Sequence, residues 1–143
     1  MNILFLLHPK ADTIYIQSSN TIRQCLERMK AHGYNTLPVI NDDGSFYGVI
    51  SQGDLLWHIV DENSFEIKEQ EHLNVSDIAC KNKYVALKVD CELDDVVNLL
   101  LDQNFVPIVD DRNFYVGIIT RKDIINYLYK SSDSYNMSKY LYK

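Results

Sequence analysis

A short pattern that occurs twice constrains this chain more than any other feature of its sequence. One copy spans residues 37–56 and the other residues 106–125. Both consist of an apolar strand with a proline, a polar turn, and then Gly, two apolar residues, Ser or Thr, two variable residues and Asp. Four landmarks recur 69 residues apart: Pro38 and Pro107, Gly48 and Gly117, Ser51 and Thr120, and Asp54 and Asp123. Self-similarity at one fixed offset indicates two copies of one structural unit.

The first half alternates between strand and helix periodicities. We expect a strand over 13–16, a helix after N-cap residues at 18–21, strands over 36–40 and 46–50 joined by a hairpin turn, and a helix opened by Ser51. Helical spacing predicts two apolar core faces: Ile22, Cys25, Leu26 and Met29, then Leu55, Leu56, Ile59 and Val60. The apolar residues 1–7 are expected to form a buried strand or helix, because no basic segment or cleavage site marks a signal peptide.

The second half repeats this order after a short helical segment at 75–78. We expect a strand over 84–89, a helix with the core face Leu93, Val96, Val97 and Leu100, strands over 105–109 and 115–119, and a helix from Thr120. The predicted domains are therefore a first repeat over 1–60, an acidic linker over 61–75, a second repeat over 76–130 and a tail over 131–143. The tail is polar and rich in tyrosine, and its sequence fits either a helix or a frayed end.

Each predicted unit is too small to bury a hydrophobic core large enough for stability by itself, although 143 residues suffice for one compact domain. The economical arrangement packs the two small sheets face to face around a pseudo-twofold axis. The expected fold class is thus α/β (α+β), with two pseudo-symmetric β-α-β-β-α units packed sheet to sheet. Related edges of the units would then meet in two equivalent clefts.

Composition excludes several classes of function. A net charge of −6 argues against nucleic acid as a partner, because phosphate backbones are bound by basic surfaces. No apolar stretch is long enough to cross a membrane, so a cytoplasmic protein is expected. The 3 cysteines and 4 histidines show no metal-ligand spacing, and no motif of a nucleophilic enzyme appears, so we predict neither a metal site nor catalysis.

The repeated segment from Gly to Asp runs from a strand straight into a helix, and this position favours an anion. A helix N-terminus offers free backbone N–H groups and the positive end of its dipole to a phosphate. Ser51 or Thr120 could add a hydroxyl to that site. Asp54 or Asp123, one turn later, could accept hydrogen bonds from the two hydroxyls of a ribose. The alternative is that these pairs only cap their helices, since Ser/Thr-x-x-Asp is close to a capping box.

Tandem units with an apolar–Pro–apolar strand followed by Gly-h-h-[Ser/Thr]-x-x-Asp resemble the paired CBS domains (cystathionine-β-synthase-type repeats), over residues 8–60 and 76–129. Members of that family bind adenosine-containing ligands, including AMP, ADP, ATP, S-adenosylmethionine and cyclic di-AMP, between the repeats. The resemblance implies that Ser51 and Thr120 contact phosphate and that Asp54 and Asp123 hold ribose. It also implies that strand residues form the adenine slot: Tyr15, Leu37, Pro38, Val85, Val106 and Pro107.

The two copies differ inside the motif, where Arg121 and Lys122 replace Gln52 and Gly53. Two cations at a helix start strengthen an anion site, so we expect Thr120, Arg121 and Asp123 to form the tighter site. The leading hypothesis is a stand-alone regulatory module that senses an adenine nucleotide, acts on an unknown effector protein and forms a homodimer. The alternatives are a dimerisation scaffold with empty clefts and a hydrolase or nucleotidyl enzyme, which would need a general base or metal cluster near the phosphate.

Overall fold

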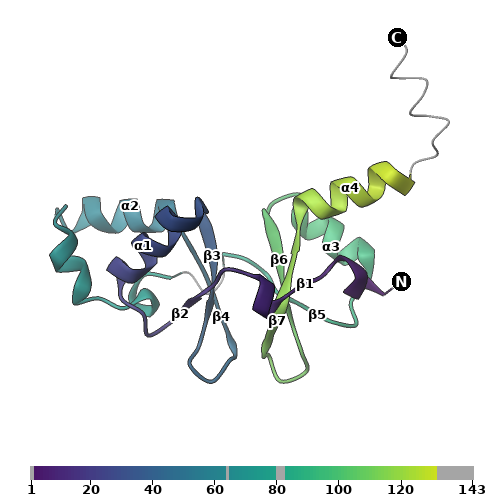
Figure 1. Cartoon of the computed structure of the whole chain (residues 1–143), viewed down its shortest axis with the longest axis horizontal. Helices are drawn as coiled ribbons and strands as arrows, with labels where there is room; N and C mark the ends of the chain where they lie inside the picture. The colour runs from purple at the N-terminus through teal and green to yellow at the C-terminus, as the bar shows by residue number, and fades with distance from the viewer. Residues whose placement is uncertain (1, 64, 80–82, 132–143) are drawn as a thin grey trace, which may run out of the picture.

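The computed structural model describes residues 2–63, 65–79 and 83–131, arranged as two units side by side (Figure 1). The α-helices are α1 Ile22–His32, α2 Gln52–Asp61, α3 Leu93–Leu100 and α4 Arg121–Ser131. Short 3-10 helices are η1 Ile3–Leu6, η2 Lys10–Asp12, η3 Ile67–Glu71 and η4 Val75–Asp77. The strands are β1 His8–Pro9, β2 Ile16–Gln17, β3 Thr36–Ile40, β4 Phe46–Ser51, β5 Leu87–Lys88, β6 Phe105–Val109 and β7 Tyr115–Thr120.

Local signals in the sequence explain where α1 begins and ends. Thr21 is the N-cap, and its side chain forms a reciprocal capping box with Gln24. Gly33 ends the helix in the left-handed region at φ 71°, where a residue without a Cβ is favoured. The predicted core face is confirmed for Ile22, Cys25 and Met29, which are buried.

The predicted core face of α2 was only partly right. Leu55 is buried, but Leu56 is 55% exposed and Val60 is also exposed. The sheet beneath α2 is small, so the helix rests on it along one narrow line. The apolar residues beside that line remain uncovered, and α4 shows the same pattern at Ile125 and Leu128.

The two sheets share one topology, which confirms the repeat. The first sheet has the strand order β2-β3-β4, and the second has β5-β6-β7 with β1 added at the edge of β7. In both units a parallel pair joins an antiparallel hairpin. Ile16 lies opposite Val39 in the first unit, and Leu87 lies opposite Ile108 in the second. The equivalence of these registers lets residues of the two clefts be compared position by position.

The N-terminal segment crosses from the first repeat to the second unit. β1 pairs antiparallel with β7, with His8 opposite Ile118, and Ile3 is fully buried in the core of the second unit. Figure 1 shows this purple segment lying along the unit that contains α3 and α4. The sequence pattern had placed residues 1–7 with the first repeat. The boundaries at 1–60, 61–75 and 76–130 otherwise stay predictions.

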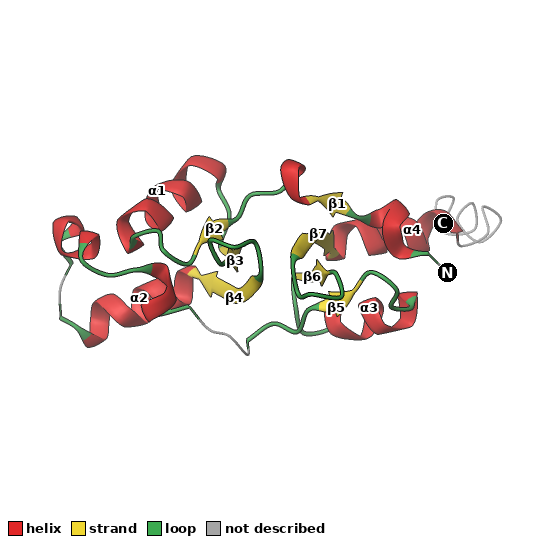
Figure 2. Cartoon of the chain, turned by 90° about the horizontal axis from the view of Figure 1, so that it is seen from below, coloured by secondary structure: helices red, strands yellow, loops and turns green. Residues whose placement is uncertain are grey.

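The two units meet sheet to sheet, as the fold class predicted. The strands of the two sheets lie next to each other in the middle of the molecule (Figure 2). Val49, Tyr84 and Phe105, which come from both units, form a buried cluster there. The hairpin tips are also joined: Phe46 N–H donates to the Asn113 carbonyl at 2.8 Å, and Tyr115 N–H donates to the Gly44 carbonyl at 3.0 Å. The helices lie on the outer sides of the pair of sheets.

The segments outside the two units are short. The predicted linker contains η3 and reaches η4, and α4 ends at Ser131. The rest of the predicted tail, residues 132–143, lies outside the described residues. Across the described ranges, none of the helices is both long and apolar enough to span a bilayer.

Candidate functional site

Both copies of the repeated motif cap the helix that follows them. Asp54 N–H donates to Ser51 Oγ at 3.1 Å, and Ser51 N–H donates to Asp54 Oδ2 at 2.8 Å. At the second copy, Asp123 N–H donates to Thr120 Oγ1 at 3.2 Å, and the Thr120 hydroxyl donates to Asp123 Oδ2 at 2.7 Å. The helix-capping role considered in the sequence analysis is therefore confirmed. A ligand at either motif would have to bind beside these capping hydrogen bonds or replace them.

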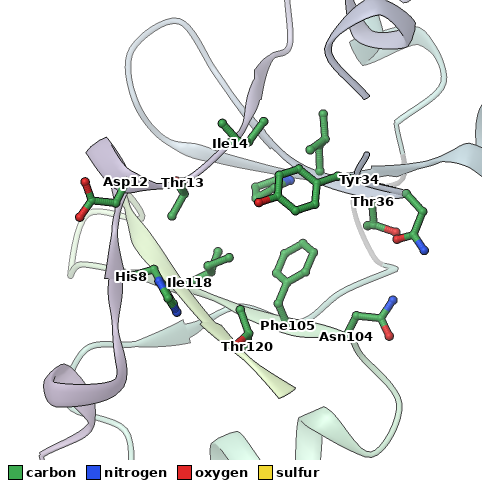
Figure 3. Close-up of a pocket in the computed structure, with 13 residues that line it drawn as sticks. His8, Asp12, Thr13, Ile14, Tyr34, Thr36, Asn104, Phe105, Ile118 and Thr120 are labelled. Carbon is green, nitrogen blue, oxygen red and sulfur yellow. The ribbon is translucent and has the colours of Figure 1, made fainter. Parts of the chain in front are cut away.

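A cavity of about 280 Å³ lies between the two sheets, beside the start of α4. We call it the Thr120 cleft (Figure 3). Its walls come from the N-terminal segment, the start of β3 and the second sheet. The lining residues are His8, Asp12, Thr13, Ile14, Tyr34, Asn35, Thr36, Leu37, Pro38, Asn104, Phe105, Ile118 and Thr120.

The Thr120 cleft has an apolar part and a polar part. Ile14, Leu37, Pro38, Phe105 and Ile118 supply an apolar slot. In Figure 3 the rings of Tyr34 and Phe105 project toward the cavity from opposite sides. Thr120 and His8 stand together on the second-sheet side, where α4 begins. A flat apolar group could enter the slot while a polar group faces the helix start.

Asp123 is not one of the residues that line the Thr120 cleft, but it contacts His8 and Thr120, which do. His8 Nε2 is hydrogen-bonded to Asp123 Oδ2, the oxygen that also accepts from Thr120. Burial by itself would raise the pKa of the Asp123 carboxyl, but the hydrogen bonds from Thr120 and His8 and the charges of His8 and Lys122 together lower it. The carboxylate is therefore held ionised, as an acceptor for sugar hydroxyls must be.

Several predicted residues do not line this cavity. Tyr15 packs its ring against Tyr115, with centroids 5.8 Å apart, and its neighbour Ile14 faces the cleft instead. Val106 and Pro107 are buried in β6, at the positions equivalent to Leu37 and Pro38. Their predicted contact with a ligand stays a prediction, which the symmetry of the repeats would assign to the other cleft.

Arg121, predicted to strengthen the anion site, makes different contacts. Its guanidinium donates to the carbonyls of Leu100 and Gln103, each at 2.9 Å. These carbonyls lie at and just beyond the end of α3, where a cation complements the helix dipole. Arg121 thus stabilises the end of α3, and its predicted contact with a ligand stays a prediction.

The sequence did not single out His8, Ile14, Tyr34, Phe105 or Ile118. Ile14 could have been found, because it is the counterpart of Val85, which was predicted. His8 could not, since only the crossing of β1 brings it to Asp123.

The equivalent place in the other half, which we call the Ser51 cleft, is occupied by side chains of the chain itself. Lys83 Nζ donates to Ser51 Oγ at 2.7 Å and lies 3.4 Å from Asp54 Oδ1. Tyr84 packs edge-on against Phe105, with ring centroids 5.0 Å apart, and its hydroxyl accepts from Asn104 N–H at 3.2 Å. Ser51 and Asp54 therefore already have a cationic partner.

Other reactive groups are placed away from the clefts or held inert. Cys25 is buried in the first core, and burial raises the pKa of its thiol to about 12. In the described part of the chain, no three His, Cys, Asp or Glu side chains are grouped so as to hold a metal ion.

Comparison with known proteins identifies the family. The model of the CBS domain matches residues 7–61 and 75–130, so the chain belongs to the CBS-domain family and carries two such domains. An uncharacterised protein of Methanopyrus kandleri is 25% identical over 118 residues, which are 81% of this chain and 58% of that protein. Inosine-5'-monophosphate dehydrogenase of Methanocaldococcus jannaschii is 25% identical over 116 residues, covering 80% of this chain and 21% of the enzyme. The chain thus spans only part of these relatives.

Solved structures share the fold. A hypothetical conserved protein from Geobacillus kaustophilus superposes with a TM-score of 0.82 at 25% identity, covering 91% of this chain and 97% of that one. CbpB of Listeria monocytogenes in complex with c-di-AMP has a TM-score of 0.81 at 22% identity, with coverages of 91% and 96%. CBSX2 in complex with AMP has a TM-score of 0.73 at 24% identity, with coverages of 90% and 96%.

Proposed function

We propose that this pair of CBS domains is a regulatory module that binds an adenosine-containing nucleotide in the Thr120 cleft. AMP, ADP, ATP and cyclic di-AMP are the candidate ligands. The observation that carries the proposal is the cavity of about 280 Å³ that joins an apolar slot to the start of α4. Pockets that bind small molecules typically combine apolar walls with a few convergent polar groups.

Each part of the nucleotide has a matching part of the cleft. The purine would lie in the slot beside Leu37, Pro38 and Phe105, which offer apolar contact to a flat ring. Asp123, ionised and acceptor-only, would bind the ribose hydroxyls in exchange for its hydrogen bond with His8. The phosphate would lie at the start of α4 beside the Thr120 hydroxyl, where Arg121 N–H donates to the Asn104 carbonyl and Asp123 N–H to Thr120 Oγ1.

Solved relatives support this assignment at the level of ligand class. CbpB and CBSX2, which share the fold, were crystallised with c-di-AMP and AMP respectively. Both ligands carry an adenine base. The likeness to these two proteins is below 25% identity, so the ligand of this chain rests on the geometry of its own cleft.

A module of this kind acts by changing its shape or its contacts when the ligand binds. A ligand that bridges the two units favours one arrangement of them, and shifts the population only by its difference in affinity between arrangements. The output then passes to a separate effector protein. The ligand is bound rather than converted.

The test is a thermal shift and calorimetry panel with AMP, ADP, ATP, S-adenosylmethionine and cyclic di-AMP, with GMP and cyclic di-GMP as matched controls. We expect at least one adenine compound to raise the melting temperature, and its guanine counterpart to have no effect. A melting temperature unmoved by every compound would overturn the proposal. It would then favour a dimerisation scaffold whose clefts bind no nucleotide, in line with the Lys83 side chain that already binds Ser51. Turnover of ATP or cyclic di-AMP by pure protein, lost in Asp123→Asn, would instead indicate an enzyme.

We also propose that the module is a homodimer formed through α2 and α4. Both helices lie along the same edge of the molecule in Figure 1. They expose apolar side chains that a monomer would leave in water: Leu56, Trp57, Val60, Ile125, Leu128 and Tyr129.

The prediction is that Trp57→Glu or Leu128→Glu converts a dimer to a monomer in native mass spectrometry. Leu101 is an exposed apolar residue beyond α3, and Leu101→Glu should leave the mass of the dimer unchanged. A wild-type monomer at micromolar concentration would contradict it.

A further inference from the structure

The two clefts differ at one pair of equivalent positions that faces the base slot. Tyr34 and Gln103 are 69 residues apart, the same offset as the repeated motif. The matching strand registers make Ile14 the counterpart of Val85, because each lies two residues before the paired strands β2 and β5. The contacts of Gln103 with Val85 can therefore be compared directly with those of Tyr34 near Ile14.

Gln103 is buried, 4% exposed, and its side chain is bound to the backbone of Val85. Its Oε1 accepts from Val85 N–H at 2.7 Å, and its Nε2 donates to the Val85 carbonyl at 3.1 Å. Nε2 also donates to the Phe105 carbonyl at 3.1 Å. The orientation of the amide is determined by these partners, because an N–H can only donate and a carbonyl can only accept.

The Gln103 amide offers Val85 the same pair of hydrogen-bonding groups as one edge of an adenine base. Adenine presents an amino donor beside a ring-nitrogen acceptor, and a primary amide presents the same two groups side by side. A base whose edge approached Val85 in the Ser51 cleft would have to compete with Gln103 for the Val85 N–H and carbonyl. Tyr84, against Phe105, covers the neighbouring apolar surface, and Lys83 holds Ser51 and Asp54 at the polar end.

The Thr120 cleft has no such internal occupant at these described positions. Tyr34 is 49% exposed, and its phenol cannot supply an amide's paired donor and acceptor to Ile14. Thr13 is the counterpart of Tyr84, because each comes one residue before the slot-facing residue, Ile14 or Val85. The first unit therefore has a small side chain where the second has an aromatic ring. The space left by the smaller side chain is part of the cavity that Thr13 and Ile14 line.

We propose that Gln103 closes the Ser51 cleft by standing in for an adenine edge, so that each chain binds its nucleotide only in the Thr120 cleft. The residue at the Tyr34/Gln103 position thus decides whether the backbone beside the base slot is available, while Lys83 and Tyr84 add to the closure of the Ser51 cleft. The inference rests on the proposed function for its ligand, but the contact itself can be tested without one.

The first experiment uses the ligand-free protein. The backbone amide of Val85 is expected to be protected from hydrogen exchange, and Gln103→Ala is expected to lower that protection about tenfold, the effect of losing one hydrogen bond. Gln103→Glu is the second variant, for use if the alanine variant fails to fold. It keeps an acceptor for the Val85 N–H but removes the donor, so the Val85 carbonyl loses its partner. Fast exchange at Val85 in the wild-type protein would overturn the inference, whatever the ligand does.

The second experiment locates AMP and cyclic di-AMP by amide chemical shifts and counts AMP by calorimetry. In the wild type we expect shifts around Ile14 but not Val85, and about one AMP per chain. In Gln103→Tyr combined with Lys83→Ala we expect shifts at both places and about two AMP per chain. The reciprocal Tyr34→Gln is expected to weaken AMP in the Thr120 cleft about tenfold, because the introduced amide would compete with the base for the Ile14 backbone.

The outcomes separate the two proposals. Binding at both clefts of the wild type, or at the Ser51 cleft alone, overturns the inference and leaves the proposed ligand class standing. No binding by either probe overturns the proposed function, and protection at Val85 then decides by itself whether Gln103 closes the cleft.

Discussion

The Thr120 cleft and the Ser51 cleft carry the same motif at the start of a helix, yet they present it differently. At the first, Asp123 is hydrogen-bonded to His8, and His8 lines an open cavity. At the second, Asp54 and Ser51 meet Lys83, while Gln103 holds the Val85 backbone. The motif itself supplies a helix cap in both places. The difference teaches that the cap anchors a possible site, whereas the residues that surround it decide whether the site is open.

The two clefts also differ in their backbone, because β1 of the N-terminal segment packs against the second motif only. β1 brings its residues against Gly117, the glycine of the second motif, which pairs with Pro9. A Cβ at Gly117 would lie 2.0 Å from the His8 carbonyl oxygen. One wall of the Thr120 cleft therefore depends on the absence of a side chain at this position.

The largest expected effect is that of Gly117→Ala. The added methyl must displace β1, and we expect a loss of about 3 kcal/mol in the free energy of unfolding, together with weaker nucleotide binding because His8 leaves the cleft wall. Urea denaturation measures the loss. Gly53→Ala is the matched control: its Cβ would meet only Ser51 Oγ at 3.6 Å, and alanine in a helix stabilises by about 0.5–1 kcal/mol. Equal stabilities for the two variants would contradict the close approach of β1.

Next in size is the contrast between paired alanine variants of the two motifs. Thr120→Ala/Asp123→Ala is expected to weaken AMP binding about 30- to 100-fold, since two hydrogen-bonding groups of the ligand lose their partners. Ser51→Ala/Asp54→Ala removes an equivalent helix cap, at about 1 kcal/mol of stability, but should leave the affinity unchanged. Calorimetry at one temperature compares them. The reverse ranking would mean that the Ser51 cleft is the binding site.

A smaller effect is expected for Lys83→Ala. Lys83 and Asp54 are partly exposed, so breaking their ion pair should cost less than about 1 kcal/mol of stability. Since Gln103 still holds Val85, the variant should bind no additional AMP. A second equivalent of AMP on Lys83→Ala alone would show that the lysine, rather than Gln103, closes the cleft.

The smallest expected effect is the contribution of Asp123 to acid stability. Its folded pKa is lowered, so its carboxylate stabilises the folded state above the unfolded pKa of about 3.9, and this contribution disappears as pH falls through the lowered value. The side chain is 29% exposed, so we expect less than about 1 kcal/mol. Denaturation at about pH 6 and about pH 3 should show a smaller loss for Asp123→Asn than for the wild type. Equal losses would mean that His8 and Thr120 do not favour the charged form.

Some features of the molecule could be predicted because they depend on neighbours in sequence. The cap at Ser51, the core face of α1 and the hairpin after Ile40 follow from residues within one or two turns of each other. The repeat offset extended those local predictions to the second half, and the fold class and the family were confirmed. The exposed face of α2 was missed because helical periodicity does not show how wide a surface lies beneath the helix.

The sequence by itself determined the repeated unit, the helix starts at Ser51 and Thr120, and the presence of a hydroxyl and a carboxylate at each. Only the tertiary structure decided that His8 reaches Asp123, that Arg121 turns to the end of α3, and that Gln103 pairs with Val85. The reason is physical: a cap joins residues 3 apart within one turn of helix, whereas each of those contacts joins separate elements whose approach depends on how the chain packs. The shared motif is therefore visible in the sequence, and the inequality of the two clefts is visible only in the fold.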